Sequence, residues 1–405
     1  MMIGNDKVRA LLLESIHSDA VSRLQAAGCV VETLRNALDE DELIERVQGV
    51  HLLGVRSKTQ VTERVLAAGS QLLGVGAFCI GTDQIDLAAA ARAGVAVFNA
   101  PFSNTRSVVE LALAEIIMLA RRATEKNAAM HEGIWDKAAT GSHEVRGRTL
   151  GIVGYGNIGT QLSVLAEALG MRVYFYDTAD KLALGNAKRC DTLDELLEVA
   201  ETITLHVDGR PGNSGFFGEE QFARMRPRSL FLNLSRGFVI DYAALREHLL
   251  SGHLAGAAID VFPQEPKGRG DEFRSELRGL PNVILTPHIG GSTEEAQADI
   301  GGFVANKLAQ YVSEGNTTLS VNLPTIALPL QPRTHRIAHV HRNTPGVLAQ
   351  VNSILAEHGV NVEGQILATR GEYGYLLTDV GVNYSDHVLT QLSAMEQTVR
   401  LRVLS

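Results

Sequence analysis

The N-terminal part of the chain, residues 1–104, alternates short continuous apolar runs with amphipathic stretches. Continuous apolar runs indicate strands that are buried on both faces, and apolar residues spaced three or four apart indicate helices. This alternation predicts βαβ units and hence a parallel sheet. The expected strands are 8–13, 49–55 and 72–76, and the expected helices are 18–27 and 40–48.

A second region with the same alternation follows a long amphipathic stretch. Residues 105–130 predict one helix with Thr105 as its N-cap. Beyond it, buried apolar runs predict a second parallel sheet, and 293–314 predicts a further helix. The expected strands of this sheet are 149–153, 172–176, 202–207, 229–234, 256–260 and 283–285.

The C-terminal region has a different order of elements. Residues 322–333 contain Pro324, Pro329 and Pro332 and little amphipathic pattern, which is typical of a linker. The order predicted beyond it is β-α-β-β-α-β, the split βαβ arrangement. Its elements are a strand at 336–341, a helix with Pro345 in its first turn and Gly359 just past its end, two strands around the turn at 370–372, a helix at 385–395 and a strand at 399–404.

Composition narrows the classes of partner. A length of 405 residues suits two or three domains. A net charge of −9 argues against a nucleic-acid or anionic-membrane partner, so that an anionic substrate needs a local basic cluster. Glu110 and Glu115 interrupt the most apolar helix, which argues against a membrane span. The separated thiols Cys29, Cys79 and Cys190, and a start without a signal pattern, predict a cytoplasmic protein; no metal site is predicted.

A glycine-rich loop follows the strand predicted at 149–153. It reads Gly154-Tyr155-Gly156-Asn157-Ile158-Gly159, and a helix pattern follows it. Two glycines allow a tight turn and close approach of the backbone to a pyrophosphate, and the third lets helix and strand pack. The spacing alone also fits a glycine-rich packing turn. Asp177, at the end of the next strand, can accept hydrogen bonds from ribose hydroxyls and repel a 2′-phosphate, which favours an NAD site.

Three polar side chains follow later strands, Arg236, Glu265 and His288. Because the carboxyl ends of parallel strands border the ligand crevice, we expect these side chains to converge there. Oxidation of a 2-hydroxy acid requires a base for the hydroxyl proton and a cation for the carboxylate, tasks that suit histidine and arginine. A neighbouring carboxylate would raise the pKa of the histidine and orient its ring. Each residue taken singly also fits an ordinary loop position.

These motifs, in this order, resemble the D-isomer-specific 2-hydroxyacid dehydrogenase family. Segments 76–82, 99–105 and 290–293 are similar to members that oxidise D-3-phosphoglycerate with NAD, the first step of L-serine biosynthesis. The resemblance covers essentially the whole chain. It implies an α/β fold with two Rossmann-like doubly wound parallel-sheet domains and a C-terminal ferredoxin-like (ACT) α+β domain. The implied domains are a substrate-binding domain split between 1–104 and 292–325, an NAD-binding domain at 105–291, and an ACT regulatory domain at 334–405.

The resemblance also implies roles for individual residues. Arg236 would bind the substrate, and Glu265 would pair with His288, the acid/base. Arg56 would bind the substrate phosphate, with Ser57 and Asn104 in the substrate pocket. The residues implied for the NAD site are Gly154, Gly156, Asn157, Ile158, Gly159, Asp177, Leu234, Ser235, Arg236, Asp260, His288, Ile289, Gly290 and Gly291.

For the C-terminal domain, the resemblance implies L-serine as an effector. Serine would be held by His341 and Asn343 together with Asn361 from a partner chain, in a homo-oligomer that relatives form as a tetramer. The alternative is a purely structural dimerisation module, since a fold alone fixes no ligand. The chain departs from its relatives at Asp208-Gly209, where proline is frequent, and at Pro332, where a glycine pair is found.

Two other functions fit the same motifs. A hydroxypyruvate or glyoxylate reductase would use the same catalytic residues, and dependence on the substrate phosphate through Arg56 would distinguish it. A dinucleotide-sensing corepressor on this scaffold would need no turnover. The presence of Arg236, Glu265 and His288 argues against the corepressor.

Overall fold

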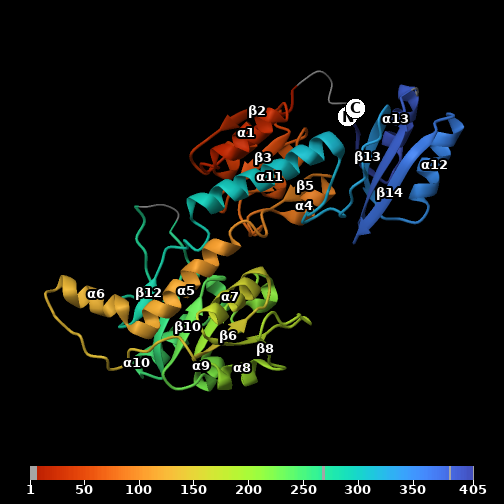
Figure 1. Ribbon diagram of the computed structural model, residues 1–405. Coiled ribbons are helices and arrows are strands. Elements are labelled where there is room, and N and C mark those ends of the chain that lie inside the picture. Colours follow the sequence, from red (N-terminus) through yellow and green to blue (C-terminus); the bar gives the residue numbers. More distant parts are fainter. Residues whose placement is uncertain (1–6, 267–269, 383–384, 405) are drawn as a thin grey trace. The chain divides into compact units, whose positions relative to one another are not determined.

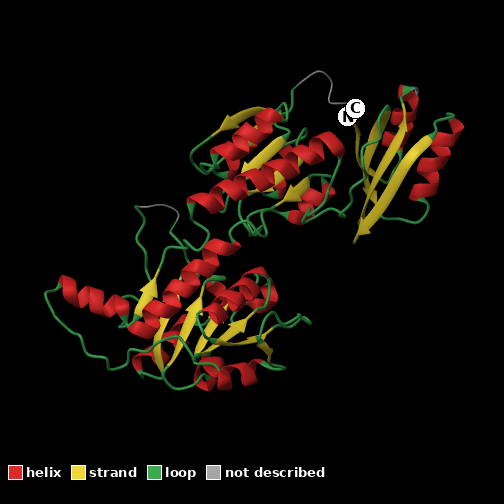
Figure 2. Ribbon diagram, viewed as in Figure 1, coloured by secondary structure: helices red, strands yellow, loops and turns green. Residues whose placement is uncertain are grey.

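The structure is a computed structural model that describes residues 7–266, 270–382 and 385–404. These residues form two compact units (Figure 1). The first unit contains the residues up to Ser103 and those from Gln297 onward, and the second contains Asn104–Ala296. Figure 2 shows that strands and helices alternate in both units. The domain boundaries expected from the sequence stay a prediction.

The first unit contains a five-stranded parallel sheet in the order β2-β1-β3-β4-β5. Its strands are β1 (Arg9–Leu12), β2 (Val30–Thr33), β3 (Leu52–Val55), β4 (Gly74–Ala77) and β5 (Ala96–Phe98). The helices between them are α1 (Ser18–Ala26), α2 (Glu40–Arg46), α3 (Glu63–Ala68) and α4 (Leu87–Arg92). The sequence analysis missed β2, because its side chains are mostly exposed and form no apolar run.

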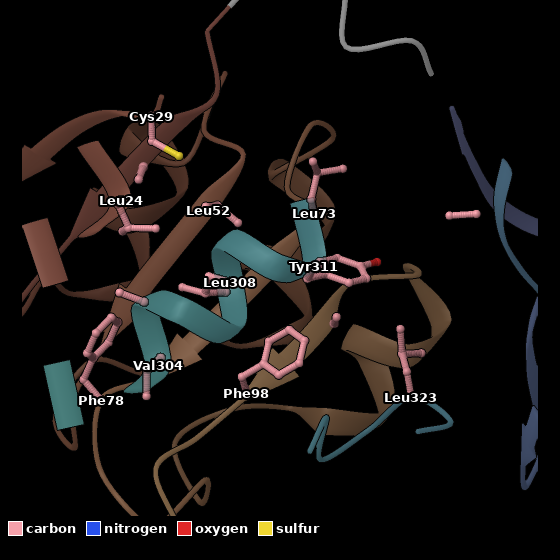
Figure 3. Close-up of a cluster of buried hydrophobic side chains, with 14 of the residues drawn as sticks. Leu24, Cys29, Leu52, Leu73, Phe78, Phe98, Val304, Leu308, Tyr311 and Leu323 are labelled. Atoms are coloured by element: carbon pink, nitrogen blue, oxygen red, sulfur yellow. The ribbon is translucent and has the colours of Figure 1, made fainter. Parts of the chain in front are cut away.

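The long helix α11 (Glu294–Glu314) supplies one wall of the core of this unit. Its residues Val304, Leu308 and Tyr311 pack among Leu52 and Phe98 from the sheet (Figure 3). All of these side chains are almost completely buried, so that the helix is fixed along the sheet by apolar contact.

The C-terminal region folds into a four-stranded antiparallel sheet in the order β14-β15-β13-β16. Its elements are β13 (Thr334–Arg342), α12 (Val347–Glu357), β14 (Val362–Arg370), β15 (Tyr373–Gly381), α13 (Asp386–Ala394) and β16 (Thr398–Leu404). The predicted order is confirmed. The predicted place of Pro345 is wrong: the helix begins at Val347 after Gly346, whose φ of 91° ends the turn before it.

One buried arginine joins this sheet to the rest of the first unit. The Arg336 guanidinium donates to both carboxylate oxygens of Asp379 at 2.7 Å. It also donates to the carbonyl oxygens of Glu314, Leu328 and Pro329 at 2.9, 2.7 and 3.0 Å. The segment expected to be a linker is therefore held by its backbone against β13.

The second unit contains a seven-stranded parallel sheet in the order β12-β11-β10-β9-β6-β7-β8. Its strands are β6 (Thr149–Val153), β7 (Arg172–Tyr176), β8 (Lys188–Arg189), β9 (Thr202–Leu205), β10 (Ser229–Asn233), β11 (Leu254–Ile259) and β12 (Val283–Leu285). Its helices are α5 (Thr105–Arg121), α6 (Ala123–His131), α7 (Asn157–Ala168), α8 (Leu193–Val199), α9 (Glu219–Arg224) and α10 (Tyr242–Leu250). The strand order reverses between β6 and β9, and in such sheets ligands bind at this switch point.

The single helix predicted for 105–130 is wrong. The structure has two helices, α5 and α6, that meet at Arg122, whose backbone is left-handed with φ 52°. Thr105 is the first helical residue, and Asn104 occupies the N-cap position without a side-chain hydrogen bond. The break carries no glycine or proline that would mark it in the sequence. Its local support is the Arg122 guanidinium, which binds Glu125 at 2.5 and 3.0 Å.

The fold class expected from the sequence is confirmed: two parallel-sheet α/β domains and a C-terminal split βαβ domain. Throughout the part of the chain that the structure describes, every helix is too short or too polar to cross a bilayer.

Candidate functional site

The turn that carries His288 is organised by a buried carboxylate. Asp260 directly follows β11 and is 1% exposed. It accepts hydrogen bonds from the backbone N–H groups of Ile289 and Gly290 at 2.8 Å each, and from the Thr286 hydroxyl at 2.6 Å. His288 itself has a left-handed backbone with φ 55°, which costs a non-glycine residue roughly 1 kcal/mol or more. Asp260 therefore stabilises a strained turn.

His288 is paired with Glu265. Its Nδ1 lies 2.9 and 3.0 Å from the two carboxylate oxygens of Glu265. A carboxylate accepts the Nδ1 proton, so Nε2 is left to exchange a proton with a bound molecule. The hydrogen bond to Glu265, which outweighs burial, raises the pKa of His288. For Glu265, burial is the largest effect and opposes ionisation, but the hydrogen bond and charge of His288, the Phe262 N–H and the charge of Arg236 together outweigh it and lower the pKa.

Arg236 lies beside this pair because of a close backbone contact. A Cβ atom on the following residue, Gly237, would lie 2.0 Å from the carbonyl carbon of Phe262. The loop after β10 thus packs directly on the turn that leads to Glu265. Arg236 is half-buried, donates to the carbonyl of Ser235 at 2.8 Å, and its charge acts on both Glu265 and His288. The structure therefore brings the three predicted catalytic residues together.

The glycine loop lies at the switch point of the sheet. A Cβ atom at Gly154 would lie 2.5 Å from the carbonyl oxygen of His206, and one at Gly159 would lie 2.3 Å from that of Gly154. A Cβ atom at Gly156 would meet no atom within 4 Å, and no side chain caps α7 there. The first turn of α7 thus faces open space with its N–H groups, an arrangement that fits a pyrophosphate.

Asp177 braces this loop. Its Oδ2 accepts from the backbone N–H of Tyr155 at 2.8 Å, and its Oδ1 accepts from that of Ala179 at 2.8 Å. Each oxygen keeps a second lone pair for a hydroxyl donor. Of the other residues expected here, Ser235 and Leu234 are buried after β10, and the Ser235 hydroxyl donates to the Asn233 side chain at 2.7 Å.

The expected substrate residues fall into both units. Asn104 belongs to the second unit and lies against the His288 turn, since a Cβ atom at Gly291 would be 2.3 Å from Asn104 Nδ2. Arg56 and Ser57 belong to the first unit. Their loop depends on a residue that the sequence analysis missed: Glu14 accepts from the backbone N–H groups at positions 56, 58 and 59, at 3.1, 3.1 and 2.9 Å.

The residues expected to hold serine differ in exposure. His341 is 2% exposed, donates through Nδ1 to the carbonyl of Arg342 at 2.8 Å, and has a buried Nε2 without a hydrogen-bond partner. Asn343 is exposed; it donates to the carbonyl of Gly371 at 3.1 Å and does not cap α12. Asn361 is exposed and donates to the Glu363 side chain at 2.7 Å.

The family of this chain follows from its similarity to known proteins. The family model of the D-isomer specific 2-hydroxyacid dehydrogenase, NAD binding domain, matches residues 113–290. The D-3-phosphoglycerate dehydrogenases of Dictyostelium discoideum and Escherichia coli (strain K12) are each 48% identical to the chain, over 98% and 99% of it and 98% of both relatives. The chain belongs to the D-isomer specific 2-hydroxyacid dehydrogenase family. It is an NAD-dependent oxidoreductase, as the sequence predicted.

Two further matches concern the C-terminal domain and the overall fold of this dehydrogenase. The model of the AHAS small subunit-like ACT domain matches residues 337–400, which confirms the expected ACT domain. The crystal structure of a glyoxylate reductase from Paecilomyes thermophila is similar with a TM-score of 0.70 and 25% identity, over 78% of this chain and 98% of that one. About a fifth of this chain therefore has no counterpart in the glyoxylate reductase.

Glu115, which the sequence analysis named only as an interruption of an apolar helix, is a second residue whose place in the fold it missed. It lies on the apolar face of α5 and is 1% exposed, and both of its carboxylate oxygens are buried without a hydrogen-bond partner. Burial, with a smaller effect from the charge of Asp260, raises its pKa to about 8. Its spacing with Ala112 and Leu119 could have placed it on the buried face. The sequence could not show that its neighbour in the fold is Asp260.

We expect E115Q to be more stable than the wild type at pH 8 and equally stable at pH 4. Between pH 4.5 and about 8 the folded protein keeps a proton that the unfolded chain has lost, so the wild type loses about 1.4 kcal/mol of unfolding free energy per pH unit. The glutamine variant has no such loss. Thermal unfolding across this pH range measures the difference.

The matched control is E110Q, which removes an exposed carboxylate from the same helix, one that is paired with Arg106 at 2.6 Å. It should follow the wild type at every pH. A wild type and an E115Q variant whose stabilities change in parallel with pH would show that Glu115 is ionised in the fold.

Proposed function

We propose that this dehydrogenase oxidises D-3-phosphoglycerate to 3-phosphohydroxypyruvate, the first step of L-serine biosynthesis. The observation that carries the proposal is the His288–Glu265 pair, with Nδ1 2.9 Å from the carboxylate, beside Arg236. The full-length similarity to D-3-phosphoglycerate dehydrogenases at 48% identity supports the choice of substrate.

Each catalytic residue has a chemical task in this proposal. Arg236 binds the substrate carboxylate with its fork of N–H donors. His288 takes the proton of the 2-hydroxyl group at Nε2, while Glu265 stabilises the resulting imidazolium through Nδ1. Asp260 holds the turn so that the imidazole keeps its orientation. The acceptor for the hydride that leaves C2 would be supplied by NAD when it is bound.

The NAD site is proposed at the switch point of the second sheet. Gly154, Gly156 and the first turn of α7, with Asn157 and Ile158, would receive the pyrophosphate. Asp177 would accept from the ribose hydroxyls with its remaining lone pairs and disfavour a 2′-phosphate. The edge of the site toward the substrate would be formed by Leu234, Ser235, Asp260, Ile289, Gly290 and Gly291.

Turnover tests the assignment of the acid/base. H288A should lower kcat with D-3-phosphoglycerate by about 10² to 10⁴ and largely retain NADH binding. E265Q should lower kcat less. Because it replaces the carboxylate, whose charge-assisted hydrogen bond raises the pKa of His288, with a neutral amide, it should also shift the acid limb of the pH–rate profile for oxidation to lower pH.

The measurement is steady-state NADH formation between pH 6 and 9, with NADH binding followed by fluorescence. Wild-type turnover in H288A would refute the assignment. A wild type that turns over no hydroxy acid at all would instead support a dinucleotide-sensing corepressor.

Arg56 is proposed to bind the substrate phosphate, and Ser57 and Asn104 are proposed as further substrate-binding residues. R56A should raise the KM for 3-phosphohydroxypyruvate at least tenfold and change that for hydroxypyruvate little, since only the first substrate carries the phosphate. K58A, in the same loop, is the matched control for loss of positive charge. Equal losses for both substrates would assign Arg56 a structural role, and equal use of both by the wild type would favour a hydroxypyruvate or glyoxylate reductase.

The proposal extends to regulation and assembly. We propose that the ACT domain binds L-serine at His341, Asn343 and the partner chain's Asn361, in a homotetramer, and that serine lowers the rate as feedback. Support comes from the ACT family match and from the unsatisfied Nε2 of His341 at the end of β13. A cytoplasmic location, favoured by three separated thiols, is part of the same proposal.

Calorimetry of serine against the wild type and N343A tests binding. The wild type should bind serine, and N343A should lose at least tenfold in affinity because it removes a polar contact. Rates with and without serine test the coupling, which needs a second conformation that serine favours. Binding without inhibition would support the serine site and refute the feedback. No binding at millimolar serine would refute both proposals.

A further inference from the structure

A cavity of about 310 Å³ lies in the first unit between the edge strand β16 and the chain just before β4. Ser70 and Leu73 line one side of it, and Ser393 and residues 398–402 line the other. None of the residues proposed for catalysis, NAD or serine lines this cavity. Its charged residues are Arg400 and Arg402, two apart on β16.

Both arginines reach from the C-terminal sheet to the remainder of the unit. Arg402 is 2% exposed; its guanidinium lies 4.2 Å from the ring centre of Tyr311 and donates through Nη2 to the carbonyl of Tyr311 at 3.0 Å. Arg400 donates through Nη1 to the carbonyl of Leu72. These contacts fix the two positive groups at the wall of the cavity.

The charge of this arginine pair is not balanced by the protein. Within residues 7–266, 270–382 and 385–404, no Asp or Glu forms an ion pair with either side chain, and Nη1 of Arg402 is buried without a hydrogen-bond partner. Burial, and to a smaller extent the charge of Arg402, lowers the pKa of Arg400. Arg336 on β13 of the same sheet shows the contrast, because Asp379 meets it with two hydrogen bonds of 2.7 Å.

A buried guanidinium without a counter-charge is costly, whereas one that meets an anion forms strong charge-assisted hydrogen bonds. We propose that the cavity between β16 and Leu73 binds a small oxyanion such as inorganic phosphate. Arg400 and Arg402 neutralise its charge, and the hydroxyl groups of Ser70 and Ser393 are further donors. The anion would contact both the ACT domain and the five-stranded part of the unit, and so stabilise their packing.

Thermal unfolding of the full chain in inorganic phosphate, against sodium chloride of equal ionic strength, tests the proposal. The unfolding midpoint of the wild type should rise by several degrees as phosphate increases, as for any ligand that binds only the folded protein. R402M should lose this rise. R46M, which removes an exposed arginine from the same unit, is the matched control and should keep it.

Two additional variants make the result specific. R56A should keep the response, which separates this cavity from the proposed substrate phosphate site. S393F fills the cavity and leaves both arginines in place, so it should lose the response even if R402M does not fold. An equal midpoint in phosphate and chloride for the wild type, or a response that survives in S393F, would overturn the proposal.

Discussion

The geometry of the candidate active site depends on the Asp260 carboxylate. Three donors from the segment 286–290 converge on it, and all three bonds are 2.6 to 2.8 Å long. A buried carboxylate is stable only when hydrogen-bond donors surround it, and the left-handed backbone of His288 is stable only when its neighbours are held in place. The hydrogen bonds between Asp260 and this segment meet both requirements. Glu265 then accepts the Nδ1 proton of the His288 ring, while Asp260 fixes the backbone of the turn. Burial and the charge of Asp260 raise the pKa of the nearby Glu115 to about 8, which favours its neutral form at pH 7.

The first unit is organised by buried cations in a similar way. Arg336 satisfies Asp379 and three backbone carbonyl groups, one of them at the end of α11. Arg402 binds a carbonyl group one turn earlier in that helix. The carbonyl end of a helix carries partial negative charge, so positive groups placed there stabilise the helix as well as the packing of the sheet on it. The apolar cluster continues across this contact through Ala338, Val340 and Tyr375.

The sequence alone predicted the features that depend on residues close together in the chain. Buried parallel strands form continuous apolar runs, so β7 and β12 were predicted with the observed bounds. The glycine loop and the residues Arg236, Glu265 and His288 occur in short motifs beside strand ends. The features that were missed depend on partners distant in the chain: Glu14 organises a loop more than forty residues away, and Glu115 lies near Asp260. The break at Arg122 lacked the residue types that usually mark one.

The contacts of Arg336 bear on how this domain arrangement can change in evolution. Here Arg336, on the first strand of the domain, donates hydrogen bonds to carbonyl oxygens of the preceding segment and of α11, so buried hydrogen bonds cross the boundary between the ACT domain and the rest of the unit. A recombination event that cuts between residues 329 and 333 would separate Arg336 from three of its acceptors, the carbonyl oxygens of Glu314, Leu328 and Pro329. Only a transfer that moves the ACT domain together with the end of α11 would keep all of these hydrogen bonds.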